Sequence, residues 1–231
     1  MRPRLALTVA ILPVALTACG GSSQGGSASP PPATEARTAP APAAKDVAGG
    51  CKQVDAPKPG KDGTLKPPKA GLDPNAGYSA TVKTNCGRFT FKLDLDAAPK
   101  AAASFAALAK QSFFDGTVFH RIAPGFVIQG GDPTGTGSGG PGYSTKDTPP
   151  SNASYTKGVV AMAKSADEAP GTAGSQFFVV TGQDTGLPAD YAVLGKVTDG
   201  LDVVQRIGRL GDSAEQPTET VLIQDVTVTK R

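Results

Sequence analysis

The feature that most constrains the fold is a series of short apolar runs, separated by Gly- and Pro-containing turns, between residues 78 and 230. In one of them, Phe89, Phe91 and Leu93 alternate with polar residues, which is typical of a half-buried strand. The eight runs with strand character cover residues 78–82, 89–95, 118–121, 126–130, 159–163, 176–181, 192–197 and 221–229. Many short strands of this kind indicate a mainly β domain, either a sandwich or a closed barrel, and periodicity alone does not choose between them.

Two helices and two local irregularities are predicted alongside the strands. Pro99 suits the first turn of a helix, and apolar residues follow it at helical spacing. A second helix is predicted over residues 201–209 on the same spacing. Residues 85–87 read Asn-Cys-Gly and predict a hairpin turn. In the last strand the apolar residues shift from odd positions, as at Ile223, to even positions, as at Val226. This change of phase predicts a bulge near Gln224 or Asp225.

Residues 1–18 have the features of an export signal. Arg2 and Arg4 provide a basic start, and residues 5–16 form an apolar run that is short for a membrane span. Small residues then lead to Cys19. This order resembles a bacterial lipoprotein signal, in which the cysteine thiol receives a diacylglycerol before cleavage. The alternative is an ordinary cleaved signal in which the cysteine is incidental.

Residues 19–74 are predicted to form a largely disordered tether to a domain over residues 75–231. The segment is rich in Gly, Ser, Pro and Lys, and it has too few large apolar residues to offset the entropy of ordering. Cys51 lies in this segment and forms an even pair of thiols with Cys86, which favours a disulfide in an exported chain. Such a bridge would pin part of the tether to the domain. Two unpaired thiols are the alternative.

Composition argues against several classes of function. The chain has 23 Lys and Arg against 20 Asp and Glu, a balance that gives no basis for nucleic-acid binding. His120 is the only histidine, so a multi-histidine metal site is excluded, and no cofactor is expected. It falls in an apolar run, which predicts a buried side chain hydrogen-bonded to the backbone. Residues 130–142 are Gly-rich but lack the lysine of a phosphate-binding loop, which predicts a flexible surface loop.

Two segments point to a specific chemistry. Residues 119–132 read Phe-His-Arg-Ile-Ala-Pro-Gly-Phe-Val-Ile-Gln-Gly-Gly-Asp, and residues 174–178 read Gly-Ser-Gln-Phe-Phe. Together they resemble the signature of cyclophilin-type peptidyl-prolyl cis-trans isomerases. The resemblance implies a closed eight-stranded antiparallel barrel, capped by two α-helices, and an enzyme that accelerates rotation about X-Pro bonds.

Such an enzyme needs neither a metal nor a nucleophile. The peptide bond resists rotation with a barrier of about 18–20 kcal/mol, while the cis and trans forms of X-Pro differ by only about 0.5–1 kcal/mol. A catalyst must therefore favour the twisted state, in which the lone pair is localised on the proline nitrogen. A guanidinium can donate to that nitrogen, and Arg121 is the predicted donor. Strand alternation predicts that Arg121 and Phe119 share one face and that His120 faces the other way.

The resemblance assigns roles to further residues. Gln129 is implied to steady Arg121 and the substrate carbonyl. The positions implied to bind the proline and its flanking peptide are Phe126, Val127, Ala163, Lys164, Gln176, Phe178, Leu187 and Tyr191. Taken singly, the apolar residues are explained more simply by core packing, and Arg121 by a surface ion pair. All of them occur in the order found in the family, however, and this favours a binding site. Gly186 stands where a drug-binding family member has tryptophan, which bears on substrate preference.

Two functions follow from these observations. The first is a monomeric, lipid-anchored isomerase on the extracytoplasmic face of the cell membrane, which assists the folding of exported proline-containing polypeptides. The second is a non-catalytic module that uses the same groove to bind proline-bearing segments. The presence of both Arg121 and Gln129 favours the enzyme.

Overall fold

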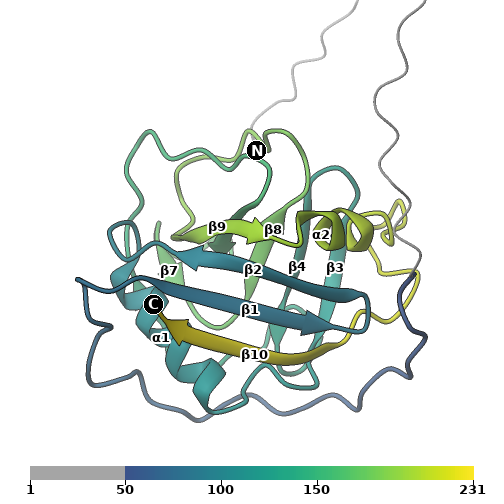
Figure 1. Cartoon of the computed structure of the whole chain (residues 1–231), viewed down its shortest axis with the longest axis horizontal. Coiled ribbons are helices and arrows are strands. Elements are labelled where there is room, and N and C mark those ends of the chain that lie inside the picture. The colour runs from purple at the N-terminus through teal and green to yellow at the C-terminus, as the bar shows by residue number, and fades with distance from the viewer. Residues whose placement is uncertain (1–49) are drawn as a thin grey trace, which may run out of the picture. The chain divides into compact units, whose positions relative to one another are not determined.

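Short strands and tight turns make up most of the computed structural model, which describes residues 50–231 (Figure 1). In chain order the elements are β1 (Tyr78–Thr84), β2 (Gly87–Leu93), α1 (Pro99–Lys110), β3 (Val118–Ala123), β4 (Val127–Asp132), β5 (Thr145–Lys146), β6 (Val159–Met162), β7 (Thr172–Ala173), β8 (Phe177–Val180), β9 (Val193–Asp199), α2 (Leu201–Ile207) and β10 (Ile223–Lys230). The fold is mainly β with two helices, as predicted. The predicted export signal and Cys19 lie outside the described residues.

The eight predicted strands form one antiparallel sheet with the order β10-β1-β2-β9-β6-β8-β4-β3. The sheet is curled, but its edges do not pair along their length: within residues 50–231, the one β-bridge between β3 and the chain before β10 joins Val118 to Leu222. The prediction of a closed barrel is therefore wrong, and the sheet is an open half-barrel. The physical reason is that β10 pairs with β1 from Ile223 to Lys230, so only the residues that precede it reach β3.

The two helices bury apolar faces against the sheet, which lies between them in Figure 1. Helix α1 begins at a proline, as predicted, and buries Phe105 and Leu108 in the core. Helix α2 ends at Ile207, two residues before the predicted end, and buries Val203, Val204 and Ile207. Neither described helix has the length and apolar content needed to cross a bilayer.

The predicted irregularities lie near the β1–β2 hairpin. Thr84 pairs with Gly87 across a two-residue turn, and Gly87 has a φ of 122°, which a residue with a side chain rarely adopts. Between β1 and β10, Lys83 pairs with Asp225 but Thr84 pairs with Ile223. Gln224 is left without a partner, so the predicted bulge is confirmed.

Residues 50–74, which we call the strap, follow a defined path along the domain and appear as the dark blue segment before β1 in Figure 1. A disulfide joins Cys51 to Cys86, as predicted. Farther along, Gly60 N–H donates to Pro133 O at 2.9 Å, and Gly63 and Leu65 donate to the carbonyls of Gly140 and Pro141. The tether predicted for residues 19–74 thus differs from the structure over the strap, because backbone hydrogen bonds and the bridge hold a segment that has few core residues.

The sheet buries apolar residues on both faces. The inner face belongs to the main core, with Phe119, Ile128 and Phe177 all fully buried. A second cluster, which we call the outer cluster, covers the other face of β4, β6 and β8. Its buried members are Ala123, Val127, Tyr155, Val159, Ala161, Phe178 and Val180. A sheet with a second apolar cluster on its outer face offers a place where an apolar ligand can bind.

Candidate functional site

A β-bulge turns Arg121 toward the outer face of the sheet. Phe119 pairs with Gly130 and Arg121 pairs with Gln129, so His120 has no partner on β4. Phe119 consequently lies in the main core, while Arg121 lies with Gln129 on the opposite face. The prediction that Phe119 and Arg121 share a face is wrong, because the extra residue reverses the alternation between them.

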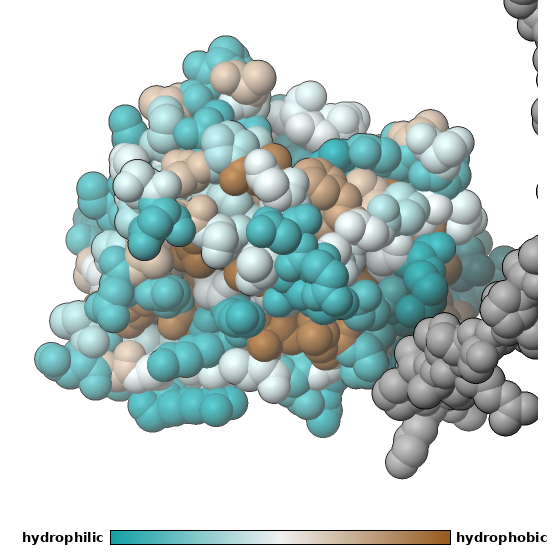
Figure 2. Space-filling view, turned by 90° about the horizontal axis from the view of Figure 1, so that it is seen from above, coloured by the Kyte–Doolittle hydropathy of each residue, from teal (hydrophilic) through white to brown (hydrophobic). Residues whose placement is uncertain are grey.

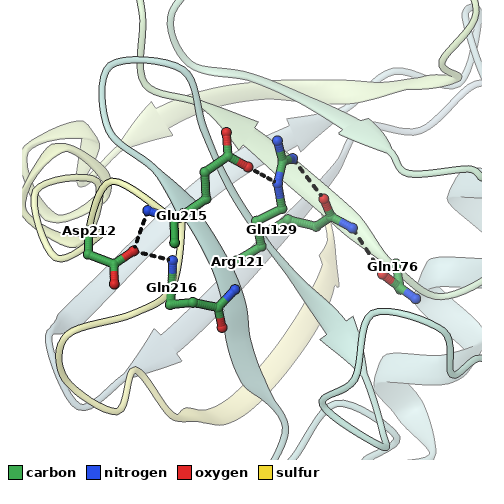
Figure 3. A network of polar contacts seen from close by, with 7 residues as sticks. Arg121, Gln129, Gln176, Asp212, Glu215 and Gln216 are labelled. Carbon is green, nitrogen blue, oxygen red and sulfur yellow. Dashed lines mark hydrogen bonds and ion pairs between the residues drawn. The ribbon is translucent and has the colours of Figure 1, made fainter.

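Cross-strand pairing brings the key side chains into one row. Arg121 on β3 pairs with Gln129 on β4, which pairs with Phe178 on β8, which pairs with Ala161 on β6. Arg121 Nη1 donates to Gln129 Oε1 at 3.2 Å, and Gln129 Nε2 donates to Gln176 Oε1 at 3.0 Å (Figure 3). Arg121 and Gln129, which the sequence predicts to act together, are thus in direct contact.

A Gly-rich loop holds the far end of this network. Gln176 Nε2 donates to the carbonyl oxygens of Gly137 and Gly139 at 2.9 and 3.0 Å. The loop is organised by the buried Asp132, whose carboxylate accepts from the backbone N–H groups of Thr134, Gly137 and Gly139. Burial by itself would raise the pKa of Asp132, but hydrogen bonds from Thr134 and the two glycines outweigh it and hold the pKa below its ordinary value. The loop predicted to be flexible is therefore tied to an ionised side chain.

The apolar residues predicted to contact proline gather at the outer cluster. Val127 and Phe178 are buried members, and Phe126, Leu187 and Tyr191 pack against them while half-buried. The guanidinium carbon of Arg121 lies 5.9 Å from the centroid of the Phe126 ring. An apolar surface with a charged edge is therefore accessible to a peptide.

The remaining predicted residues line a hollow beside this surface. Ala163, Lys164 and Gln176 border it together with Gln129, and Asp62 of the strap closes another side. Lys164 Nζ donates to the carbonyls of Ser165 and Glu168 and lies 5.6 Å from the Tyr191 ring centroid. The structure thus brings all ten predicted residues to one continuous region of the surface.

His120 takes no part in the network. Neither of its ring nitrogens has a hydrogen-bond partner among residues 50–231, so the predicted bond to the backbone is absent. Burial lowers the pKa of His120, which keeps the ring neutral. The folded state therefore disfavours the protonated ring. Because the unfolded state takes up this proton more readily, the free energy of unfolding decreases as the pH falls below about 6.5.

The structure adds Glu215 to the site, a residue that the sequence does not single out. Arg121 Nε donates to Glu215 Oε2 at 2.6 Å (Figure 3). Glu215 lies in the connection between α2 and β10, and its separation of 94 residues from Arg121 carries no periodic or motif signal. Only the path of that connection along β3 brings the two charges together.

The family model described as "Cyclophilin type peptidyl-prolyl cis-trans isomerase/CLD" matches residues 79–228. The chain belongs to this family. Among its curated relatives is peptidyl-prolyl cis-trans isomerase A of Mycobacterium tuberculosis, which is 38% identical over 174 residues and aligns with 67% of this chain and 94% of its own length. Peptidyl-prolyl cis-trans isomerase-like 3 of Mus musculus is 36% identical over 156 residues, covering 65% of this chain and 95% of that protein.

Solved structures give the same result. A cyclophilin-type peptidyl-prolyl cis-trans isomerase of Cryptosporidium parvum, crystallised in the presence of the dipeptide Ala-Pro, has a TM-score of 0.61 and 32% identity, covering 66% of this chain and 99% of that one. The chain is accordingly a cyclophilin-type peptidyl-prolyl cis-trans isomerase. The strap precedes the part of this cyclophilin that the family model matches.

Proposed function

We propose that this cyclophilin catalyses X-Pro rotation through Arg121, steadied by Gln129, on proline-containing segments of exported polypeptides. One observation carries the proposal. The Arg121 guanidinium lies at the edge of an accessible apolar cluster, and the residues of the described part of the chain use only part of its hydrogen-bonding capacity. A proline ring on the cluster would bring the proline nitrogen within reach of a fixed cation.

In the proposed mechanism the arginine acts on the twisted peptide bond. Planar X-Pro has little electron density to offer at nitrogen, because the lone pair is delocalised into the carbonyl. As the bond twists, the lone pair localises and accepts a hydrogen bond from Arg121. This interaction is stronger in the transition state than in either planar state, so it raises the rate in both directions and leaves the equilibrium unchanged.

The other residues are proposed to hold the peptide on both sides of that bond. Phe126, Phe178 and Leu187 would receive the proline ring, with Val127 beneath it and Tyr191 beside it. The hollow lined by Ala163, Lys164 and Gln176 would receive the residues before proline. Fixing one side of the bond while the other turns also contributes to catalysis, because the peptide is held in one orientation relative to Arg121.

We also propose that the enzyme is a monomeric lipoprotein, held at the extracytoplasmic face of the membrane through Cys19. The order of basic, apolar and small residues before that cysteine supports the anchor. The disulfide between Cys51 and Cys86 supports an oxidising compartment. On the face seen in Figure 2, apolar surface is divided into separate patches by hydrophilic residues, which supports a monomer.

Cys19→Ala is expected to release the protein from the membrane fraction, because the thiol that carries the lipid is lost. Fractionation followed by immunoblotting measures this, with Ser22→Ala as a matched neighbouring control that should stay in the membrane. Mass spectrometry of the wild-type N-terminus should find a diacylated cysteine. An unmodified N-terminus at another residue would end the lipoprotein proposal.

The enzymatic proposal is tested by exchange spectroscopy on a short X-Pro peptide, an assay that uses no protease. Catalytic amounts of the full-length protein should accelerate cis–trans exchange, and a chelator should not change the rate. Binding of the peptide without any acceleration would replace the enzyme by the non-catalytic binding module.

A further inference from the structure

Glu215 occupies a defined place beside the proposed catalytic arginine. Its carboxylate accepts the Nε–H of Arg121 at 2.6 Å, and the two side chains are 43% and 35% exposed. Gln129 accepts an Nη1 hydrogen of the same guanidinium at 3.2 Å. Figure 3 shows the two acceptors on different sides of the guanidinium, one reaching from a loop and one from β4.

This arrangement leaves a specific part of the guanidinium free. The group has five N–H donors in a rigid plane. Within residues 50–231, Glu215 and Gln129 accept from two of the five donors, so three remain for a substrate. Because the plane is rigid, two acceptors on two differently directed N–H groups fix its orientation. The directions of the three free donors are then fixed as well.

The backbone of Glu215 is itself held at the edge of the sheet. Ile122 N–H, one residue after Arg121, donates to Glu215 O at 3.0 Å. Asp212 closes the loop by accepting from the backbone N–H groups of Ala214 and Gln216, both at 2.8 Å (Figure 3). The backbone of Glu215 has a φ of 61°, an uncommon conformation for a residue with a side chain. These hydrogen bonds hold the loop in a defined conformation, and the loop in turn holds the Glu215 carboxylate beside Arg121.

We propose that Glu215 is a positioning residue for Arg121, and that the loop over residues 211–217 is part of the isomerase site. The inference rests on the proposed role of Arg121. An exposed ion pair contributes little to stability, so a contribution to the free energy of unfolding does not explain this pair. Orientation matters much more, since a small misplacement of a catalytic group can lower a rate by up to about 100-fold.

Charge and orientation make opposite contributions, and three substitutions separate them. The carboxylate partly neutralises the guanidinium, so its removal by itself would strengthen the donor. Glu215→Gln removes the charge but keeps an oxygen acceptor at the same distance from the backbone. Glu215→Asp keeps the charge but shortens the side chain by one methylene, and Glu215→Ala removes the acceptor. Positioning predicts that the Gln variant retains most of the activity and that the Asp and Ala variants have a lower activity.

The test measures catalysed exchange of an X-Pro peptide and the peptide Kd for the full-length protein. Glu215→Ala is expected to lower the exchange rate about tenfold with the Kd changed less than twofold, because the arginine acts on the twisted state. Glu219→Ala is the matched control: it removes an exposed acid on the same connection that has no ion pair within residues 50–231, and it should keep the wild-type rate. Thermal unfolding of every variant reports on the fold.

A double-mutant cycle distinguishes positioning from a general effect of the loop. In an Arg121→Ala background, Glu215→Ala should lower the rate no further, because the group that it positions is gone. A further tenfold loss in that background, or a full rate in the single variant, would overturn the inference. If Arg121→Ala itself keeps full activity, the arginine mechanism fails instead, so the two failures are distinguishable.

A second measurement follows the hydrogen bond itself and uses only proteins that have an oxygen acceptor at residue 215. The Arg121 Nε–H resonance of the wild-type protein should be protected from solvent exchange by the 2.6 Å hydrogen bond. Protection should persist in Glu215→Gln and be lost in Glu215→Asp. Rapid solvent exchange of this proton in the wild type would also count against the proposal.

Discussion

Arg121→Ala is expected to lower the rate of catalysed X-Pro exchange by about two to three decades, which corresponds to about 2.7–4 kcal/mol of transition-state stabilisation. The substitution removes the only cation that contacts both Gln129 and Glu215 within the described residues. The fold should survive, because the side chain is 35% exposed and its ion pair contributes about 0–1 kcal/mol to stability. Exchange spectroscopy gives the rate, and thermal unfolding checks the fold.

Two further variants sharpen this result. Arg121→Lys should recover little activity, because an ammonium cannot donate to Glu215, Gln129 and a proline nitrogen in one plane. Arg88→Ala, at an exposed arginine of β2, serves as the matched control and should leave the rate unchanged. A normally folded Arg121→Ala protein with full activity would refute the arginine mechanism while leaving the family membership intact.

Removal of the disulfide by the double substitution Cys51→Ala/Cys86→Ala is expected to destabilise the domain by about 3–4 kcal/mol. The bridge spans 35 residues, and the chain-entropy model assigns this contribution to the unfolded state. For a domain of this size the loss corresponds to a fall in Tm of roughly 10 °C. Calorimetry of the wild-type and double-variant proteins measures it.

Reductant provides the control for this experiment. It should lower the Tm of the wild type to that of the double variant and should leave the double variant unchanged. Since Asn85, next to Cys86, bonds to Lys52 O and to Thr220 O, part of the strap should stay in contact with the hairpin without the bridge. Equal Tm values for the oxidised wild type and the double variant would show that the bridge does not stabilise the folded state.

The elements of the fold were predictable because each has a local signal. Alternation identifies the strands, Pro99 identifies the start of α1, and the phase change identifies the bulge at Gln224. What escaped prediction depends on neighbours distant in the sequence. The two-residue strands β5 and β7 pair only with each other and are too short to show a period. Closure of the barrel depends on where β10 lies relative to β3, which no local pattern encodes.

The site was predictable to a similar extent. The residues of its network from Arg121 to Gln176 lie in two motifs, and the sheet register brings those motifs together. Alternation failed at His120, because the run predicted as a strand ends at residue 121, before Ile122 shows the change of phase that the bulge produces. Glu215 and Asp62 come from loops whose composition resembles that of any exposed segment, so only their folded paths relate them to the site.

The backbone conformation of Glu215 has a consequence for engineering. A φ of 61° disfavours glutamate by about 1–2 kcal/mol relative to glycine. A screen that selects heat resistance alone should therefore favour Glu215→Gly, which relieves this strain and removes the carboxylate at once. The selected proteins would survive higher temperatures and turn over their substrate more slowly. Selection for thermal stability would then favour glycine at position 215, whereas selection for a high catalytic rate would favour glutamate.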